Sequence, residues 1–146
     1  MLPTLGGRIQ TRIFLLATVG VIVTLLITPI LPGLTGPLSA NYATTFIILA
    51  TVVVLGVLWE FLYHFLMQFR WEKDWPTMFG FLTLINEGLL VWGLLELGVV
   101  PGVNPAPPAS AFWIMFLVVW FCQWAVANGP MRVPFIHWRF RGGRLI

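Results

Sequence analysis

Charged side chains are scarce in this sequence. Its 146 residues include eight basic and five acidic side chains, so that 9% of the chain is charged, whereas soluble domains carry roughly 25% charged residues. Hydrophobic residues make up 59% of the chain, and the mean hydropathy is +0.93. So few charges cannot coat a globule in water, and we therefore expect an integral membrane protein.

Cysteine and histidine are also rare, which excludes several kinds of site. A single cysteine, Cys122, cannot form an internal disulfide, a CxxC redox pair or a thiolate metal cage. Two histidines, His64 and His137, cannot supply the paired axial ligands of intramembrane haems. The sequence also lacks the glycine-rich and serine motifs of nucleotide-binding proteins and acyl hydrolases. We therefore expect no bound cofactor and no metal, and an enzymatic activity has little support.

Four long apolar runs are present instead. They cover residues 13–31, 42–69, 77–100 and 111–127, with lengths of 19, 28, 24 and 17 residues. A helix needs about 20 apolar residues to cross a hydrocarbon core about 30 Å thick. The runs are continuous rather than alternating, which excludes a barrel. We expect an all-α fold with four transmembrane helices in an antiparallel bundle, a single domain over residues 1–146 that ends in a cytoplasmic tail at residues 129–146.

The basic residues indicate how these spans are oriented. In a four-span arrangement all of them fall on one side and the two opposite connections contain none; they are Arg8, Arg12, Arg70, Lys73, Arg132, Arg139, Arg141 and Arg144. Basic residues are enriched on the cytoplasmic side of membrane proteins, so we expect both termini in the cytoplasm, in a bacterial cell membrane. A cleaved signal peptide is the alternative for the first run, but the run is long and residues 37–40 make a poor cleavage site.

Polar residues interrupt the second and third runs at matching depths. Glu60 and His64 share a helix face because they are four residues apart. Glu60 and Glu87 each lie about 15 Å from the short connection between the two runs. Charged groups at that depth are costly and are expected to face one another. The sequence therefore predicts an intramembrane polar cluster formed by Glu60, His64, Thr83, Asn86 and Glu87.

Three interpretations of this cluster remain open. The favoured one is a structural clasp, in which hydrogen bonds among Glu60, His64 and Glu87 hold the helices in register. The second is a proton or ion relay, with His64 passing protons toward the cytoplasm. The third is a metal site, which is weak because the chain has one Glu-x-x-x-His spacing rather than the paired Glu-x-x-His motifs of di-iron bundles.

The tail combines positive charge with aromatic side chains. Residues 131–146 contain four arginines and no acidic residue. Such a segment is typical of an anchor for anionic lipid headgroups at the cytoplasmic face, and docking onto a partner is the alternative. Nucleic-acid binding is disfavoured because the tail is short and partly apolar. The residues expected to contact the membrane surface or a partner are Arg132, His137, Trp138, Arg139, Arg141 and Arg144.

The leading functional hypothesis is a non-catalytic accessory or scaffolding subunit of a larger membrane complex, such as a respiratory or transport complex. Its partners would be other membrane subunits or further copies of this chain. The hypothesis follows from short connections, aromatic-rich spans and the lack of a complete cofactor motif. The alternative is a proton-linked small carrier or channel that uses Glu60, His64 and Glu87. A membrane enzyme comes third, because the sequence offers no convincing nucleophile–base pair or metal set.

Overall fold

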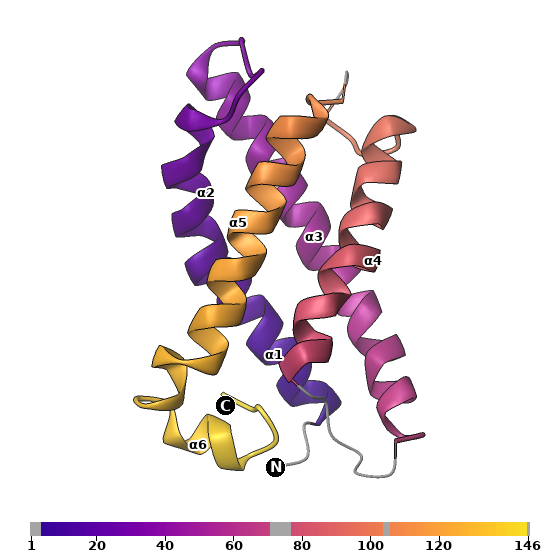
Figure 1. Cartoon of the computed structure of the whole chain (residues 1–146), viewed down its shortest axis with the longest axis vertical. Coiled ribbons are helices and arrows are strands. Elements are labelled where there is room, and N and C mark those ends of the chain that lie inside the picture. Colours follow the sequence, from indigo (N-terminus) through magenta and orange to yellow (C-terminus); the bar gives the residue numbers. More distant parts are fainter. Residues whose placement is uncertain (1–3, 71–76, 104–105, 146) are drawn as a thin grey trace.

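A computed structural model describes residues 4–70, 77–103 and 106–145, apart from the side chains of Thr77 and Arg139 (Figure 1). This part of the chain is helical and contains no strand. Four helical segments are long and apolar enough to cross a membrane. The expected all-α fold with four membrane-spanning helices is therefore confirmed at the level of helix length and composition.

The first spanning segment is one helical run from Leu5 to Ile30 whose geometry changes along its length. Four elements follow one another without interruption: α1 (Leu5–Leu15), a π-helical turn η1 (Leu16–Gly20), α2 (Val21–Ile27) and a 3-10 turn η2 (Thr28–Ile30). Pro29 and Pro32 lack the amide hydrogens that a continuing α-helix would need. The run consequently ends at this point.

The same run begins earlier than the hydropathy pattern suggests. Thr4 caps α1, because the backbone N–H of Gly7 donates to Thr4 Oγ1 at 3.1 Å. The helix therefore starts eight residues before position 13, and Arg8 and Arg12 lie inside it rather than ahead of it. Ion pairs to acidic side chains, described below, allow both arginines to occupy a helix that packs inside the protein.

The other three spans lie within four residues of their expected boundaries. They are α3 (Leu38–Met67), α4 (Thr77–Glu96) and α5 (Ala109–Asn128). Prolines directly precede α3 and α5, where the missing N–H of a proline does little harm. Past the end of α4, Gly98 adopts a φ of 69°, the left-handed conformation that closes many helices. A short 3-10 turn, η3 (Pro130–Arg132), and α6 (Ile136–Phe140) complete the described chain.

The four spans close around a common interior. The run formed by α1, η1 and α2 packs against both α3 and α5, and α4 also packs against both α3 and α5 (Figure 1). In one half of this interior, next to the connection at residues 31–37, the core is apolar. Its buried members include Leu16, Leu49, Val52, Val91, Leu95, Phe112 and Phe116.

Aromatic rings on α5 form the central part of this core. Phe112, Phe116 and Trp120 stack along one helix face, with ring centroids 5.7 and 5.5 Å apart. Gly88 of α4 permits the close approach, because a Cβ at that position would lie 2.8 Å from the ring of Trp113 and 2.9 Å from the ring of Phe116. The stack ends at Trp120, where the apolar core meets a group of charged side chains.

Candidate functional site

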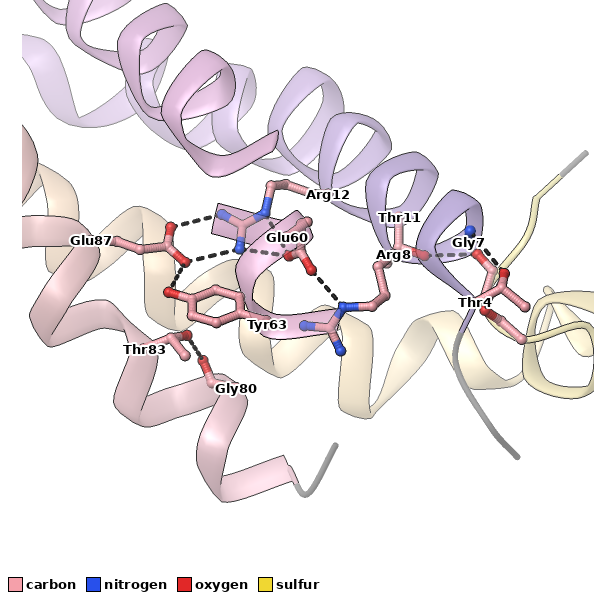
Figure 2. Close-up of polar contacts among 12 residues, drawn as sticks. Thr4, Gly7, Arg8, Thr11, Arg12, Glu60, Tyr63, Gly80, Thr83 and Glu87 are labelled. Carbon is pink, nitrogen blue, oxygen red and sulfur yellow. Dashed lines mark hydrogen bonds and ion pairs between the residues drawn. The ribbon is translucent and has the colours of Figure 1, made fainter. Parts of the chain in front are cut away.

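Arg12 lies at the centre of a network of charged side chains in the interior (Figure 2). Its Nη1 and Nη2 donate to Glu87 Oε2 and Oε1 at 2.8 and 2.9 Å, which makes a bidentate pair. Its Nε donates to Glu60 Oε1 at 2.8 Å. One guanidinium therefore joins α1 to carboxylates on both α3 and α4, in the planar fork geometry that only arginine provides.

A second arginine completes the charge balance. Arg8, one turn before Arg12 on α1, donates from Nε to Glu60 Oε2 at 2.6 Å. Each oxygen of Glu60 thus accepts from a different arginine. The four side chains, which we call the Arg–Glu network (Arg8, Arg12, Glu60 and Glu87), contain two positive and two negative formal charges. Their sum is zero, as is needed for charges removed from water.

Tyr63 and Asn86 extend the network. The Tyr63 hydroxyl donates to Glu87 Oε1 at 2.9 Å and accepts from Asn86 Nδ2 at 2.7 Å. Tyr63 lies three residues after Glu60, so both side chains project from the same side of α3. Asn86 precedes Glu87 on α4. The bond from Tyr63 occupies a further lone pair of the buried Glu87 carboxylate, and both bonds tie α3 to α4 directly.

Small and aromatic neighbours shape the space around Arg12. A Cβ at position 56 would lie 2.6 Å from Arg12 Nη1 and 2.8 Å from Arg12 Cδ, so Gly56 of α3 leaves room for this side chain. The Arg12 guanidinium carbon also lies 5.7 Å from the ring centroid of Trp120, within the range of a cation–π contact. The guanidinium is therefore held by charge, by shape and by an aromatic face.

Little of the network is exposed. Glu87 is 2% exposed and Glu60 is 6% exposed, and the side chains of Arg8 and Arg12 are 9% and 11% exposed. Buried charges of this kind are tolerated only when they are paired and hydrogen-bonded. Removing one partner of such a pair costs about 3–5 kcal/mol, because it leaves an uncompensated buried charge.

Three of the five residues expected in the intramembrane cluster belong to or reach the Arg–Glu network, and two do not. Glu60 and Glu87 both bind Arg12, and Asn86 reaches Glu87 through Tyr63. Thr83 instead donates to the carbonyl of Gly80 in its own helix at 2.9 Å. Within the described residues, His64 Nδ1 is buried without a hydrogen-bond partner. His64 therefore does not bridge the two glutamates, because arginine occupies the space between them.

The residues that sequence reasoning missed are Arg8, Arg12 and Tyr63. Hydropathy places both arginines in the cytoplasmic flank, because they precede the apolar run that starts at residue 13. Two features of the sequence favour a position inside the bundle, next to Glu60 and Glu87. Arg8 and Arg12 are four residues apart and so share a helix face, and two arginines match the two carboxylates that the spans carry at mid-depth.

The tail residues expected at the membrane surface differ in how far they are exposed. Trp138 is turned inward and donates from Nε1 to Thr11 Oγ1 at 2.7 Å. Arg132 is exposed and donates to Asn128 Oδ1 at 3.2 Å. His137, Arg141 and Arg144 are exposed as well, while the side chain of Arg139 lies outside the described part. Of these tail residues, Trp138 contacts α1, whereas Arg132, His137, Arg141 and Arg144 face outward.

Glu60 and Glu87 are poorly placed to bind a metal ion. In residues 4–70, 77–103 and 106–145, no three histidine, cysteine, aspartate or glutamate side chains come together in a way that could hold one. Where Glu60 and Glu87 approach each other, the positive charge between them is already supplied by Arg12. The arrangement is suited to holding helices together rather than to ligating a cation.

Comparisons with known proteins give no functional lead. No protein-family model, no curated protein and no solved structure matches this chain significantly. The geometry of the network and of its surroundings is thus the basis for a functional proposal.

Proposed function

We propose that this chain is a four-span antiparallel bundle of a bacterial plasma membrane, with both termini in the cytoplasm. Contact between the two ends of the chain supports this arrangement, because Thr4 N donates to Gly142 O at 2.9 Å. The basic residues also support it: the connections at residues 31–37 and 97–108 contain none. Arg70 follows α3, and four further arginines follow α5, as the positive-inside rule requires. Lys73 lies outside the described residues.

Within this arrangement, the function best supported is that of a non-catalytic accessory or scaffolding subunit of a larger membrane complex. The observation that carries the proposal is the zero net charge of the Arg–Glu network. Every carboxylate oxygen of Glu60 and Glu87 accepts from an arginine. A site for catalysis or transport needs a group that is free to bind or to exchange protons, whereas these groups are engaged in joining α1, α3 and α4.

Assembly state is the direct test of this proposal. Native membranes would be solubilised in a mild detergent, with the chain at its endogenous level and carrying an epitope tag, and resolved by blue-native electrophoresis. We expect a band well above that of the 16.5 kDa chain, with other subunits identified in it by mass spectrometry. The purified, overexpressed chain serves as the size control. A lone monomer at endogenous level would contradict the proposal.

A proton-linked carrier or channel is the second candidate. One observation favours it: hydrogen bonds connect Arg12 to Glu87, Glu87 to Tyr63 and Tyr63 to Asn86 without interruption. Chains of polar side chains inside a membrane protein are typical of proton pathways. If the chain conducts, liposomes containing the wild type should show proton flux, and Glu87→Gln should abolish it. Equal background flux in both would exclude this function.

A further inference from the structure

The tail and the Arg–Glu network lie on different faces of α1. Arg8 and Arg12, four residues apart, face α3 and α4. Residues at spacings of three and four on another face contact the tail instead; they are Thr4, Gly7, Gln10, Thr11 and Phe14. Such spacings place residues along a single stripe of a helix. The tail therefore packs on a face of α1 adjacent to the face that carries both arginines.

The contact between α1 and the tail is specific and involves backbone atoms. Thr11 Oγ1 donates to Gly143 O at 2.9 Å, and Leu145 N donates to Gln10 Oε1 at 2.9 Å. The rings of Phe14 and Phe135 meet edge to face, with centroids 5.6 Å apart. Together with the bond from Trp138 to Thr11, these contacts hold the tail along about three turns of α1.

Glycines on both sides make this approach possible. A Cβ on Gly7 would lie 2.1 Å from Gly142 O and 2.7 Å from Gly143 C, so no larger residue fits while the tail is docked. Gly142 and Gly143 have φ values of 65° and 86°, a region that other residues rarely adopt. The neighbouring Gly6 has nothing within 4 Å of the equivalent position. Gly7 is therefore required by the tail, whereas Gly6 is not.

The outward side of the docked tail is both basic and apolar. Arg132, Arg141 and Arg144 are exposed, and residues 129–146 contain no acidic side chain that could neutralise them. Phe140 is 73% exposed and Ile136 is 59% exposed. A surface with exposed aromatic and aliphatic groups next to arginines matches the boundary between anionic headgroups and acyl chains.

We propose that the docked tail is a binding surface for anionic lipids, and that a lipid bound there stabilises the Arg–Glu network through α1. The outer side of the tail supplies charge and apolar contact for the lipid. Its inner side holds the helix that positions Arg8 and Arg12. A ligand that binds the docked state alone must favour that state. The tail, α1 and the Arg–Glu network all belong to this one chain, so the coupling requires no partner subunit.

Lipid selectivity of the purified full-length chain tests the surface. Native mass spectrometry in detergent would count bound phosphatidylglycerol and bound phosphatidylcholine. We expect preferential binding of phosphatidylglycerol. Replacing both Arg141 and Arg144 with glutamine should weaken that binding about fivefold per arginine, since each basic residue near an anionic surface contributes about 1 kcal/mol. Arg70→Gln removes a positive charge outside the tail and should leave the preference in place.

Thermal unfolding tests the coupling to α1. The midpoint of the wild type should be higher with phosphatidylglycerol than with phosphatidylcholine, and Gly6→Ala should behave in the same way. Gly7→Ala should lower the midpoint and remove most of the difference between the two lipids, because the tail can no longer dock. Soluble glycerol phosphate should not reproduce the increase, because it lacks the acyl chains that the apolar side chains would contact.

Several results would overturn the inference. Equal binding of the two lipids by the wild type would exclude an anionic-lipid surface, and undiminished binding by the Arg141→Gln, Arg144→Gln variant would place the lipid elsewhere. A wild-type midpoint that is independent of lipid would exclude the coupling. If Gly7→Ala fails to fold, the Arg141→Gln, Arg144→Gln variant still tests the coupling between lipid binding and stability. Both arginines are exposed, so their replacement should lower only the midpoint measured with phosphatidylglycerol.

Discussion

The side chain of Arg12 occupies the space that any Cβ on residue 56 would need. That Cβ would lie 2.6 Å from Arg12 Nη1, so a glycine in α3 and an arginine in α1 fit together as a matched pair. The guanidinium cannot simply move aside, because Glu60 and Glu87 hold three of its N–H groups. The geometry of the Arg–Glu network therefore depends on an uncharged residue that makes none of its hydrogen bonds.

Gly56→Ala should be destabilising although alanine normally favours a helix. Adding atoms to a filled interior typically costs about 1–3 kcal/mol in free energy of unfolding, which would be measured here in mixed detergent micelles. Gly93→Ala in α4 is the matched control, since nothing lies within 4 Å of its added Cβ; it should be neutral or stabilise by up to about 1 kcal/mol. Equal effects of the two changes would contradict the close fit between Arg12 and Gly56.

Arg12→Gln should be the most damaging single change in the network. It leaves two buried carboxylates with a single arginine, Arg8, which binds Glu60, and we expect a loss of about 3–5 kcal/mol in free energy of unfolding. Arg12→Lys keeps the charge but cannot reproduce the bidentate fork, so it should recover part of this loss. The double variant Arg12→Gln, Glu87→Gln removes one charge of each sign and should be more stable than Arg12→Gln alone. Additive losses in this cycle would argue against a direct pair.

Glu87→Gln is expected to destabilise the protein. A clasp made of neutral hydrogen bonds would tolerate glutamine, because glutamine also forms hydrogen bonds. Two charge-assisted bonds from Arg12 end on Glu87, and bonds to charged groups contribute about 1.5–3 kcal/mol each. We therefore expect a loss of at least about 1.5 kcal/mol in the same micelle assay, whereas full stability would show that charge pairing is unimportant here.

His64→Leu should have a much smaller effect than any change in the Arg–Glu network. His64 Nδ1 makes no hydrogen bond within the described residues, so replacing the imidazole breaks no hydrogen bond at that nitrogen. Hydrophobic replacement at similar volume costs less than about 1.5 kcal/mol, measured as the free energy of unfolding. A loss as large as that of Arg12→Gln would restore His64 as a member of the clasp.

Membrane orientation can be tested with single cysteines in a Cys122→Ser background. Ser39, Ser110 and Arg141 are all exposed, the first two near the connections that carry no basic residue and the third in the tail. Cysteines at positions 39 and 110 should react with an impermeant thiol reagent added to intact cells, whereas a cysteine at position 141 should react only after the cells are opened. Labelling at position 141 in intact cells would overturn the proposed topology.

The sequence by itself determined the class of the protein and the approximate position of three of its four long helices, α3, α4 and α5. Apolar runs of sufficient length specify membrane-spanning helices because each helix satisfies its own backbone hydrogen bonds. The limits of these runs predict the ends of α3, α4 and α5 to within four residues. The presence of Glu60 and Glu87 at similar depth also follows from counting residues along two helices of constant rise.

The tertiary structure alone decided which groups those carboxylates meet. Depth does not reveal how a helix is rotated about its axis or which neighbour approaches it most closely, so spacing alone indicates His64 as the partner of Glu60 and Glu87. The choice of Arg12 depends on α1 approaching α3 at Gly56, and the inward turn of the tail depends on Gly7 meeting Gly142. Both are contacts between segments distant in the chain, and hydropathy carries no information about such contacts because it records only how each segment relates to its solvent.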